Sequence, residues 1–321
     1  MMFSLGDLTE DCGLKYNKTV ILNRPEVFAF CEEHQEWFED IVIPFHKDGM
    51  TYGWLADGQM YKIGVKNGKI ERIVIVTKVQ HSKRMMMKIT YDGTEFSGFQ
   101  IQSKDRSVQG EIEKIVSEIH QEPTRISGAS RTDAGVHALA QVIHFDTDRE
   151  ETPERWLYYL NKRLPKDIHV MEARLVHPLF HSRYDVLKKE YRYRLNLNEF
   201  NPLNRHFEWY VGSLDMNRLQ EECACFIGTH DFTSFSKGEK DSKIRTIYKA
   251  EVQLFPNYVE IVFEGDGFLR YMIRLMVFSL VKIAQGNLKV SVQELLEEKS
   301  RKRTIHLAPA GGLYLSRVDY E

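Results

Sequence analysis

The chain has 321 residues, of which 42% are hydrophobic, and a formal net charge of −2. This length allows two domains or one large domain with an addition, and the composition argues against wholesale disorder. The near-neutral charge excludes a global cationic attraction to nucleic acid, so any RNA or DNA binding has to come from a local patch.

Cysteine spacing and hydropathy indicate a cytoplasmic protein. The four cysteines form no C-x-x-C pair, which disfavours both a disulfide framework and zinc fingers. Residues 1–13 carry acidic side chains and lack the apolar stretch of a signal peptide. The longest apolar runs, such as residues 275–281, are too short to span a bilayer. We therefore expect reduced thiols and no membrane association.

Residues 1–84 are predicted to form a small α+β extension. Apolar spacing predicts a helix over residues 24–41. Residues 50–79 are typical of strands, and two dipeptides that favour tight hairpin turns interrupt them, namely Asp57-Gly58 and Asn67-Gly68. The charges of this extension nearly balance, so they indicate no particular partner.

From residue 85 to the C-terminus, predicted strands and helices alternate. Strands are predicted over 85–93, 140–148, the second half of 180–198, and both sides of Pro256-Asn257 within 243–267, and helices over 106–121 and 268–284. This alternation predicts an α+β fold, with mixed and antiparallel sheets and helices packed on one side.

The stretch SGASRTDAGVH at residues 127–137 places one carboxylate, Asp133, on a turn bracketed by two glycines. A carboxylate can act as a covalent nucleophile if it stays ionised, and a nearby guanidinium favours the ionised form. Arg131 and Arg274 are both candidates for that guanidinium. Taken alone, an ordinary Asx turn is the commoner explanation of such a stretch.

A metal site is a second interpretation of this region. Asp133, His137, His144 and Asp146 lie within fourteen residues, but no pair has a familiar metal spacing such as H-E-x-x-H. Structural histidines are therefore the preferred interpretation. The sequence also lacks a G-x-S-x-G elbow and a P-loop, which disfavours a serine hydrolase and a nucleotide-dependent enzyme.

The stretch KKEYRYR at residues 188–194 interleaves basic and aromatic side chains. Rings can stack on unpaired bases, and Lys or Arg can bind phosphates, so this pattern is compatible with RNA binding. An amphipathic strand with a solvated basic face is the commoner origin of the same pattern.

Together these stretches resemble the tRNA pseudouridine synthase A family from about residue 85 to the C-terminus. Seven blocks follow the order of that family: YDGTEFSGFQIQ (91–102), RTDAGVHALAQVIHFDT (131–147), NKRLPKDI (161–168), FHSRYDVLKKEYRY (180–193), GTHDFTSF (228–235), YMIR (271–274) and APAGGLYLSRVDY (308–320). The R-T-D-A-G-V-H motif alone is highly specific.

The resemblance implies a pseudouridine synthase fold over 85–321, with two similar-sized α+β halves around a catalytic cleft. It implies an isomerase that converts uridine to pseudouridine in the anticodon stem-loop of tRNA, at positions 38, 39 and 40. It further implies a homodimer that binds tRNA and needs neither a cofactor nor a metal.

The resemblance also assigns residue roles. Asp133 matches the nucleophile, with attack on the ribose and attack on the base both left open. Arg131 matches the arginine that enters the RNA stem and helps displace the target base, which must be flipped out of its helix. Arg274 matches the partner of the carboxylate, and Tyr191 matches the tyrosine that stacks on the uracil and can take part in proton transfer. The expected basic RNA contacts are Arg106, Lys162, Arg163, Lys188 and Lys189.

The chain departs from the family pattern at several positions. Ser130 stands where glycine commonly precedes the R-T-D motif, and Phe278 replaces a common glycine on the late helix. A non-catalytic RNA-binding or tRNA-folding protein on the same scaffold is an alternative, and the four intact residues with chemical roles argue against it. A hydrolase built on the Asp/His cluster would leave the other six blocks unexplained.

Overall fold

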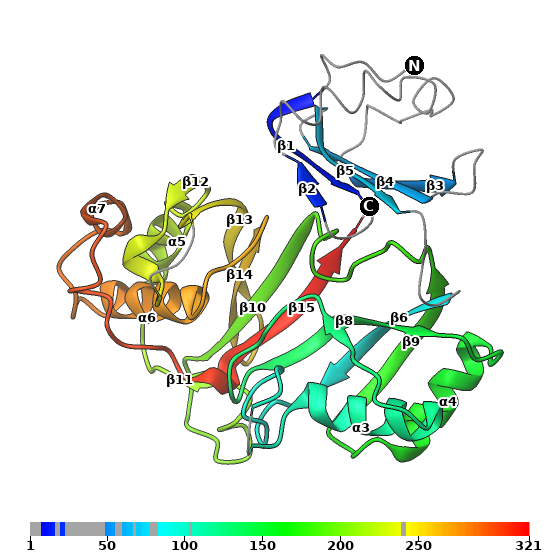
Figure 1. Cartoon of the computed structure of the whole chain (residues 1–321). Helices are drawn as coiled ribbons and strands as arrows, with labels where there is room; N and C mark the ends of the chain where they lie inside the picture. The colour runs from blue at the N-terminus through cyan, green and yellow to red at the C-terminus, as the bar shows by residue number, and fades with distance from the viewer. Residues whose placement is uncertain are drawn as a thin grey trace.

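The computed structural model describes residues 8–16, 20–22, 49–54, 60–66, 69–76, 83–102, 105–238 and 242–320. The described strands form two separate sheets (Figure 1). The smaller N-terminal sheet has the strand order β2-β1-β5-β4-β3. The larger sheet has the order β12-β13-β14-β10-β15-β8-β6-β9, with β11 beside β10 and β7 beside β8.

The N-terminal sheet consists of β1 (Leu8–Tyr16), β2 (Val20–Leu22), β3 (Gly49–Trp54), β4 (Met60–Lys66) and β5 (Lys69–Val76). Strands β4 and β5 pair antiparallel as far as Lys66 and Lys69, as expected of strands joined at Asn67-Gly68, and the dipeptide itself lies outside the described residues. Strands β3 and β4 also pair antiparallel, as expected. The helix predicted over 24–41 lies outside the described residues, and β1 and β2 were not predicted.

The larger sheet consists of β6 (Lys83–Tyr91), β7 (Ser127–Gly128), β8 (His137–Thr147), β9 (Ile168–Val176), β10 (Lys188–Asn196), β11 (Trp209–Tyr210), β12 (Gly228–Asp231), β13 (Ile244–Leu254), β14 (Val259–Gly265) and β15 (Leu313–Asp319). The C-terminal strand β15 lies between β10, with which it runs antiparallel, and β8, with which it runs parallel. The sheet is therefore mixed, and β15 connects the group of strands β12, β13, β14 and β10 to the group β8, β6 and β9.

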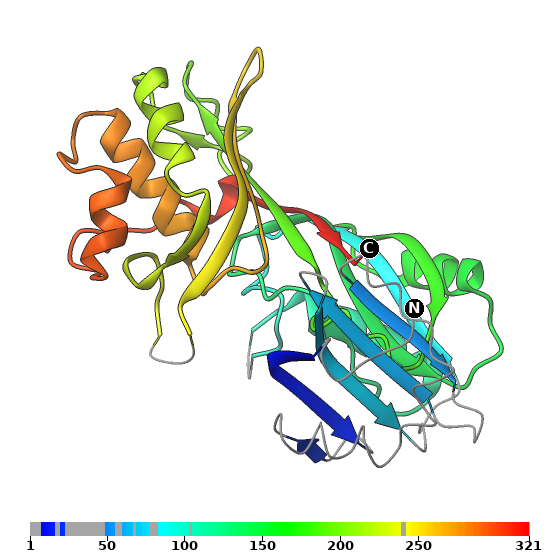
Figure 2. The same cartoon turned by 90° about the horizontal axis from the view of Figure 1, so that it is seen from above.

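The described α-helices are α3 (Val108–His120), α4 (Pro153–Arg163), α5 (Met216–Ala224), α6 (Met272–Ala284) and α7 (Val292–Glu298). Helices α3 and α4 lie with β6, β8 and β9, whereas α5, α6 and α7 lie on the other side of β15, as two views show (Figures 1 and 2). Helix α3 begins where the Ser107 side chain accepts a hydrogen bond from Gly110 N.

Helix α6 begins four residues later than the predicted start at Phe268. Tyr271 has φ +64°, a left-handed conformation that an α-helix does not contain, so the helix starts at Met272. Most of its side chains are buried rather than one face only. Phe278, the departure from a family glycine, stacks on Trp209 with ring centroids 5.9 Å apart and planes 9° apart, so the added ring has a packing partner.

The predicted fold class is confirmed, since helices pack on a mixed, largely antiparallel sheet. One cluster of buried apolar side chains runs from β6 and α3 through β10 and β15 to α6 and α7. Among the described residues, no helix has the length and hydropathy to cross a membrane. The continuous core fixes β8, β10 and α6 relative to one another. Tyr191 lies on β10, Arg274 lies on α6, and Asp133 lies on the turn that leads into β8.

Candidate active site

Asp133 lies on the turn that connects β7 to β8, and the preceding loop holds this turn in place. Phe99 N donates to Thr132 O at 3.1 Å, and Gly135 N donates to Phe96 O at 3.2 Å. Gly98 has φ +104°, and a Cβ there would lie 2.8 Å from Thr132 O, so only glycine fits this close approach. The backbone on both sides of Asp133 is thus anchored to the 96–99 loop.

Ser130 is the most heavily tethered residue of the turn. Its backbone N–H donates to Gln141 Oε1 at 3.1 Å, and its carbonyl accepts from Gln141 Nε2 at 2.7 Å. Its hydroxyl lies 2.6 Å from the hydroxyl of Tyr191 on β10. The next hydroxyl, that of Thr132, lies 2.7 Å from the hydroxyl of Tyr91 on β6. Side chains from three strands therefore fix the turn before a substrate arrives.

The Asp133 carboxylate faces Arg274 in the first turn of α6. Asp133 Oδ2 lies 3.5 Å from an Arg274 terminal nitrogen, and their side chains are 22% and 14% exposed. Burial raises the pKa of the Asp133 carboxyl above its usual value, and the charges of Arg274 and Arg270 oppose that rise. A carboxyl with a perturbed pKa beside a specific guanidinium is typical of a functional site.

Arg274 is itself positioned by backbone contacts. Its Nε donates to Ala308 O at 2.8 Å, and Ala308 N donates back to Arg274 O at 3.1 Å. The guanidinium lies 5.8 Å from the ring centre of Tyr271. The segment that leads into β15 therefore aims Arg274 at Asp133.

Tyr191 lies on β10 with its ring almost completely buried, at 6% exposure. Burial raises the pKa of its phenol to about 12, and the charge of Asp133 adds to the rise. The Phe268 ring meets it edge-on, with centroids 5.1 Å apart and planes 80° apart. The phenol is thus neutral at pH 7 and is held between Phe268 and the Asp133 turn.

Arg131, two residues before Asp133, is exposed. Its guanidinium makes no hydrogen bond or ion pair to any residue that the structure describes. An exposed guanidinium without such a partner is available for an external polar group.

The sequence model described as tRNA pseudouridine synthase matches residues 87–185 and 223–321 of this chain. Curated relatives named tRNA pseudouridine synthase A come from Staphylococcus carnosus, at 41% identity over 73% of this chain and 90% of the relative, and from Geobacillus sp., at 39% identity over 75% and 99%. A third, from Anoxybacillus flavithermus, is 43% identical over 74% and 99%.

This chain belongs to the tRNA pseudouridine synthase A family. The activity of the family is that of an isomerase which forms pseudouridine in tRNA. A solved structure titled "Crystal Structure of a Cbf5-Nop10-Gar1 Complex" covers 60% of this chain and 54% of that chain with a TM-score of 0.24 and 10% identity, a likeness too low to define the fold. Residues 1–86 and 186–222 lie outside the match to the family model.

The expected RNA contacts of this synthase fall into two groups. Lys162 and Arg163 are exposed at the end of α4. Lys188 pairs with Glu264 at 2.9 Å, and Lys189 donates to Ala129 O at 2.6 Å while burial lowers its pKa to about 8. Arg106 forms two hydrogen bonds to Asp167, at 2.7 and 3.0 Å, and one to Glu111 at 2.8 Å. The last three side chains therefore have internal partners in this state.

The histidines and Asp146 near Asp133 have structural surroundings. His137 accepts from Gly93 N at 3.0 Å, lies 2.8 Å from His206 O and stacks on Tyr314, and burial lowers its pKa. Asp146 binds the guanidinium of Arg84 with both oxygens, at 2.6 and 2.9 Å. Within the described ranges, no three His, Cys, Asp or Glu side chains are placed to hold a metal ion.

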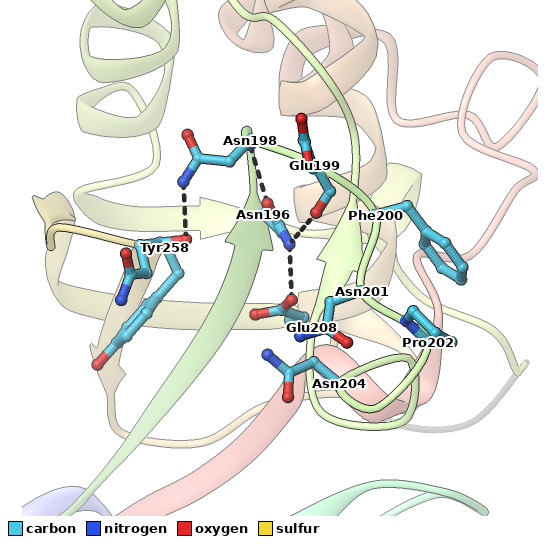
Figure 3. A pocket seen from close by; sticks show the side chains of 10 residues that line it. Asn196, Asn198, Glu199, Phe200, Asn201, Pro202, Asn204, Glu208 and Tyr258 are labelled. Carbon is cyan, nitrogen blue, oxygen red and sulfur yellow. Dashed lines mark hydrogen bonds between the residues drawn. The ribbon is translucent and has the colours of Figure 1, made fainter.

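A hollow of about 720 Å³ lies on the segment that follows β10, and its lining does not include Asp133, Arg274 or Tyr191 (Figure 3). Asn196 Nδ2 donates to Glu208 Oε1 at 2.7 Å and to Glu199 O at 3.1 Å, so the amides are paired within the wall. Carboxylates in the lining disfavour phosphate binding. The lining residues are Asn196, Asn198, Glu199, Phe200, Asn201, Pro202, Asn204, Glu208, Asn257 and Tyr258.

The roles of three residues at the site were not predicted from the sequence. Arg270 contributes a second positive charge near Asp133, and it stands in the same stretch as Arg274, one residue before the YMIR block. Ser130 and Gln141 hold the turn through contacts across the fold. The isolated Gln141 within an apolar strand was the one available signal, because a buried amide needs partners.

Proposed function

We propose that this synthase isomerises uridine to pseudouridine in the anticodon stem-loop of tRNA, at positions 38, 39 and 40, with Asp133 as the nucleophile. The observation that carries the proposal is the Asp133 carboxylate on a pre-formed turn, 3.5 Å from the Arg274 guanidinium and next to the buried Tyr191. A nucleophile, an ionising partner and an aromatic wall converge there from three separate elements.

The division of labour follows from charge and burial. Asp133 has to be ionised to attack the ribose or the base, and Arg274 favours that form against the effect of burial. Tyr191 presents its buried ring to the flipped uracil. Exposed Arg131 enters the space that the base leaves, since a paired uridine has to be unstacked at a cost of a few kcal/mol.

The reaction breaks the bond between uracil N1 and the ribose and forms a bond from uracil C5 to the same ribose carbon. The proton displaced from C5 is matched by one gained at N1, so substrate and product have the same composition. No stoichiometric co-reactant enters, and the proposal requires neither a cofactor nor a metal.

Exposed Lys162 and Arg163 are the members of the expected RNA-contact set best suited to bind phosphates directly. Lys188, Lys189 and Arg106 would first have to leave their internal partners. We further propose that the active species is a cytoplasmic homodimer in which a tRNA contacts both subunits.

The test is to incubate the full chain with unmodified tRNA transcripts that carry uridine at only one of positions 38, 39 and 40. Pseudouridine mapping should detect product at these sites and none in a transcript that carries uridine only elsewhere in the stem. Tight tRNA binding without product at any site would refute the proposal and favour the non-catalytic RNA-binding alternative.

A further inference from the structure

The N-terminal sheet contacts the catalytic region through a buried lysine. Lys62 on β4 forms an ion pair with Asp185, and the two side chains are only 5% and 1% exposed. Lys62 Nζ also donates to Leu179 O at 3.1 Å. The N-terminal sheet lies on the β6 and β8 side of the larger sheet in both views (Figures 1 and 2). Such burial requires close docking, because a charged lysine is almost never fully buried unless it is paired.

Lys62 contacts Leu179 and Asp185, which lie in the connection between β9 and β10. Residues 177–185 of this connection are called the 177–185 segment below. Three side chains from outside this segment donate hydrogen bonds to its backbone carbonyls. Lys62 takes Leu179 O, Arg84 of β6 takes Phe180 O, and Tyr320 donates to Ser182 O at 2.6 Å. Within the segment, Asp185 Oδ2 accepts from His181 N at 2.8 Å. The partner of Lys62 is therefore also the residue that closes the turn of the segment.

The 177–185 segment in turn holds the base of the catalytic turn. Ser182 Oγ donates to Ser127 O at 2.9 Å, and Ser127 begins the stretch that reaches Asp133 six residues later. Ser182 N donates to His144 Nδ1 at 3.1 Å on β8, the strand that leaves the same turn. The end of the segment leads within three residues into β10, which carries Tyr191. The two chain segments that carry Ser130 and Tyr191 therefore both start next to the 177–185 segment.

The junction contains two pairs of a cation and a carboxylate. Arg84 is paired with Asp146, and Lys62 is paired with Asp185. Burial lowers the pKa of His144 to about 2 and of His177 and His181 to about 4, so these rings are neutral at pH 7. Taking the ammonium of Lys62 away removes the cation that is paired with the buried Asp185 carboxylate, and breaking a buried ion pair by removing one partner is strongly destabilising.

We propose that the N-terminal sheet is an integral support of the active site, and that Lys62 is a positioning residue which fixes the 177–185 segment and through it the Asp133 turn and the Tyr191 strand. A domain that moved independently on a linker would leave the Lys62 side chain exposed to solvent instead of burying it against Asp185. The effect on rate rests on the proposed function, whereas the docking contact does not.

The docking contact is tested in the full chain by urea unfolding of Lys62→Met, Asp185→Asn and the double variant. Lys88→Met is the matched control, because Lys88 forms an exposed pair with Glu172 at 3.0 Å on β6. Lys62→Met should lower the unfolding midpoint clearly and Lys88→Met hardly at all. The double variant should lose less than the sum of the single losses. Additive losses, or equal midpoints for the two lysine variants, would overturn the docking contact.

The support role is tested by kinetics on unmodified tRNA at a temperature where every variant is folded. Lys62→Met should lower kcat about tenfold, equivalent to ~1.4 kcal/mol, with KM within about twofold. Lys62→Arg should restore much of the loss. If the unfolding cycle shows that Lys62 and Asp185 are coupled but Lys62→Met has a normal kcat, the support role is overturned and the docking contact stands. A wild-type protein without activity would refute the proposed function, and the unfolding cycle would still decide the docking contact.

Discussion

Replacing Ser130 with alanine removes the hydroxyl that pairs with Tyr191 at 2.6 Å. The Tyr191 ring is 6% exposed, so its hydroxyl would be left buried without that partner. An unsatisfied buried hydroxyl costs about 1–3 kcal/mol, more than the net worth of the hydrogen bond itself. We therefore expect Ser130→Ala to lower the free energy of unfolding by about 1–3 kcal/mol.

The same reasoning predicts what a second substitution does. In Ser130→Ala/Tyr191→Phe both polar groups are absent, so no buried hydroxyl is left without a partner. The double variant should therefore lose about 1 kcal/mol less free energy of unfolding than the sum of the two single losses. Urea unfolding at pH 7 measures all four corners of this cycle. Ser127→Ala is the control, since Ser127 lies on the same stretch and its hydroxyl has no hydrogen bond to a described residue. Additive single losses, or a Ser127→Ala loss as large as that of Ser130→Ala, would refute the reasoning.

Three further predictions concern charge. Arg274→Met removes a charge that lowers the pKa of Asp133, so this pKa should rise further. Because attack needs the ionised carboxylate, the fall of kcat/KM on the acidic side of the pH profile should occur at a higher pH in Arg274→Met than in the wild type. An unchanged acidic side of the profile would contradict the pairing of Arg274 with Asp133. Arg131→Ala should lower kcat on tRNA with an unchanged unfolding midpoint, because Arg131 is exposed, and an unchanged kcat would remove its assigned role. In filter binding, Lys162→Gln should reduce the slope of log affinity against log salt by about 1, whereas Lys188→Gln, which removes a lysine paired with Glu264, should change it less. Equal slopes for the two variants would contradict this distinction.

Regular elements could be predicted where one local rule decides them. The Asn67-Gly68 dipeptide predicted the antiparallel pairing of β4 with β5, and apolar spacing predicted α3. The start of α6 was wrong by four residues because Tyr271 adopts a left-handed conformation. No local pattern specifies that conformation in a tyrosine, because it is imposed by the chain around it.

The part of the site that could be predicted from the sequence is the part that a recognisable motif contains. The R-T-D motif singled out Asp133, and Arg274, 141 residues away, was one of two candidate partners until the family resemblance favoured it. The contacts that hold the turn were not predictable, because Ser130 and Tyr191 are 61 residues apart in sequence and meet only through the sheet. The same limit applies to Lys188, since Glu264, its partner, lies on β14, which pairs antiparallel with β10. Basic residues counted along a sequence therefore overstate the charge that is free to bind RNA.

The most direct test of the central claim is pseudouridine mapping in unmodified tRNA after incubation with wild-type and Asp133→Asn protein. The substitution keeps the size of the side chain and removes the charge that has to attack. We predict product in the anticodon arm with the wild type and none with Asp133→Asn, which should still bind tRNA with similar affinity. Product formed by the Asp133→Asn protein would contradict the assignment of Asp133 as the nucleophile.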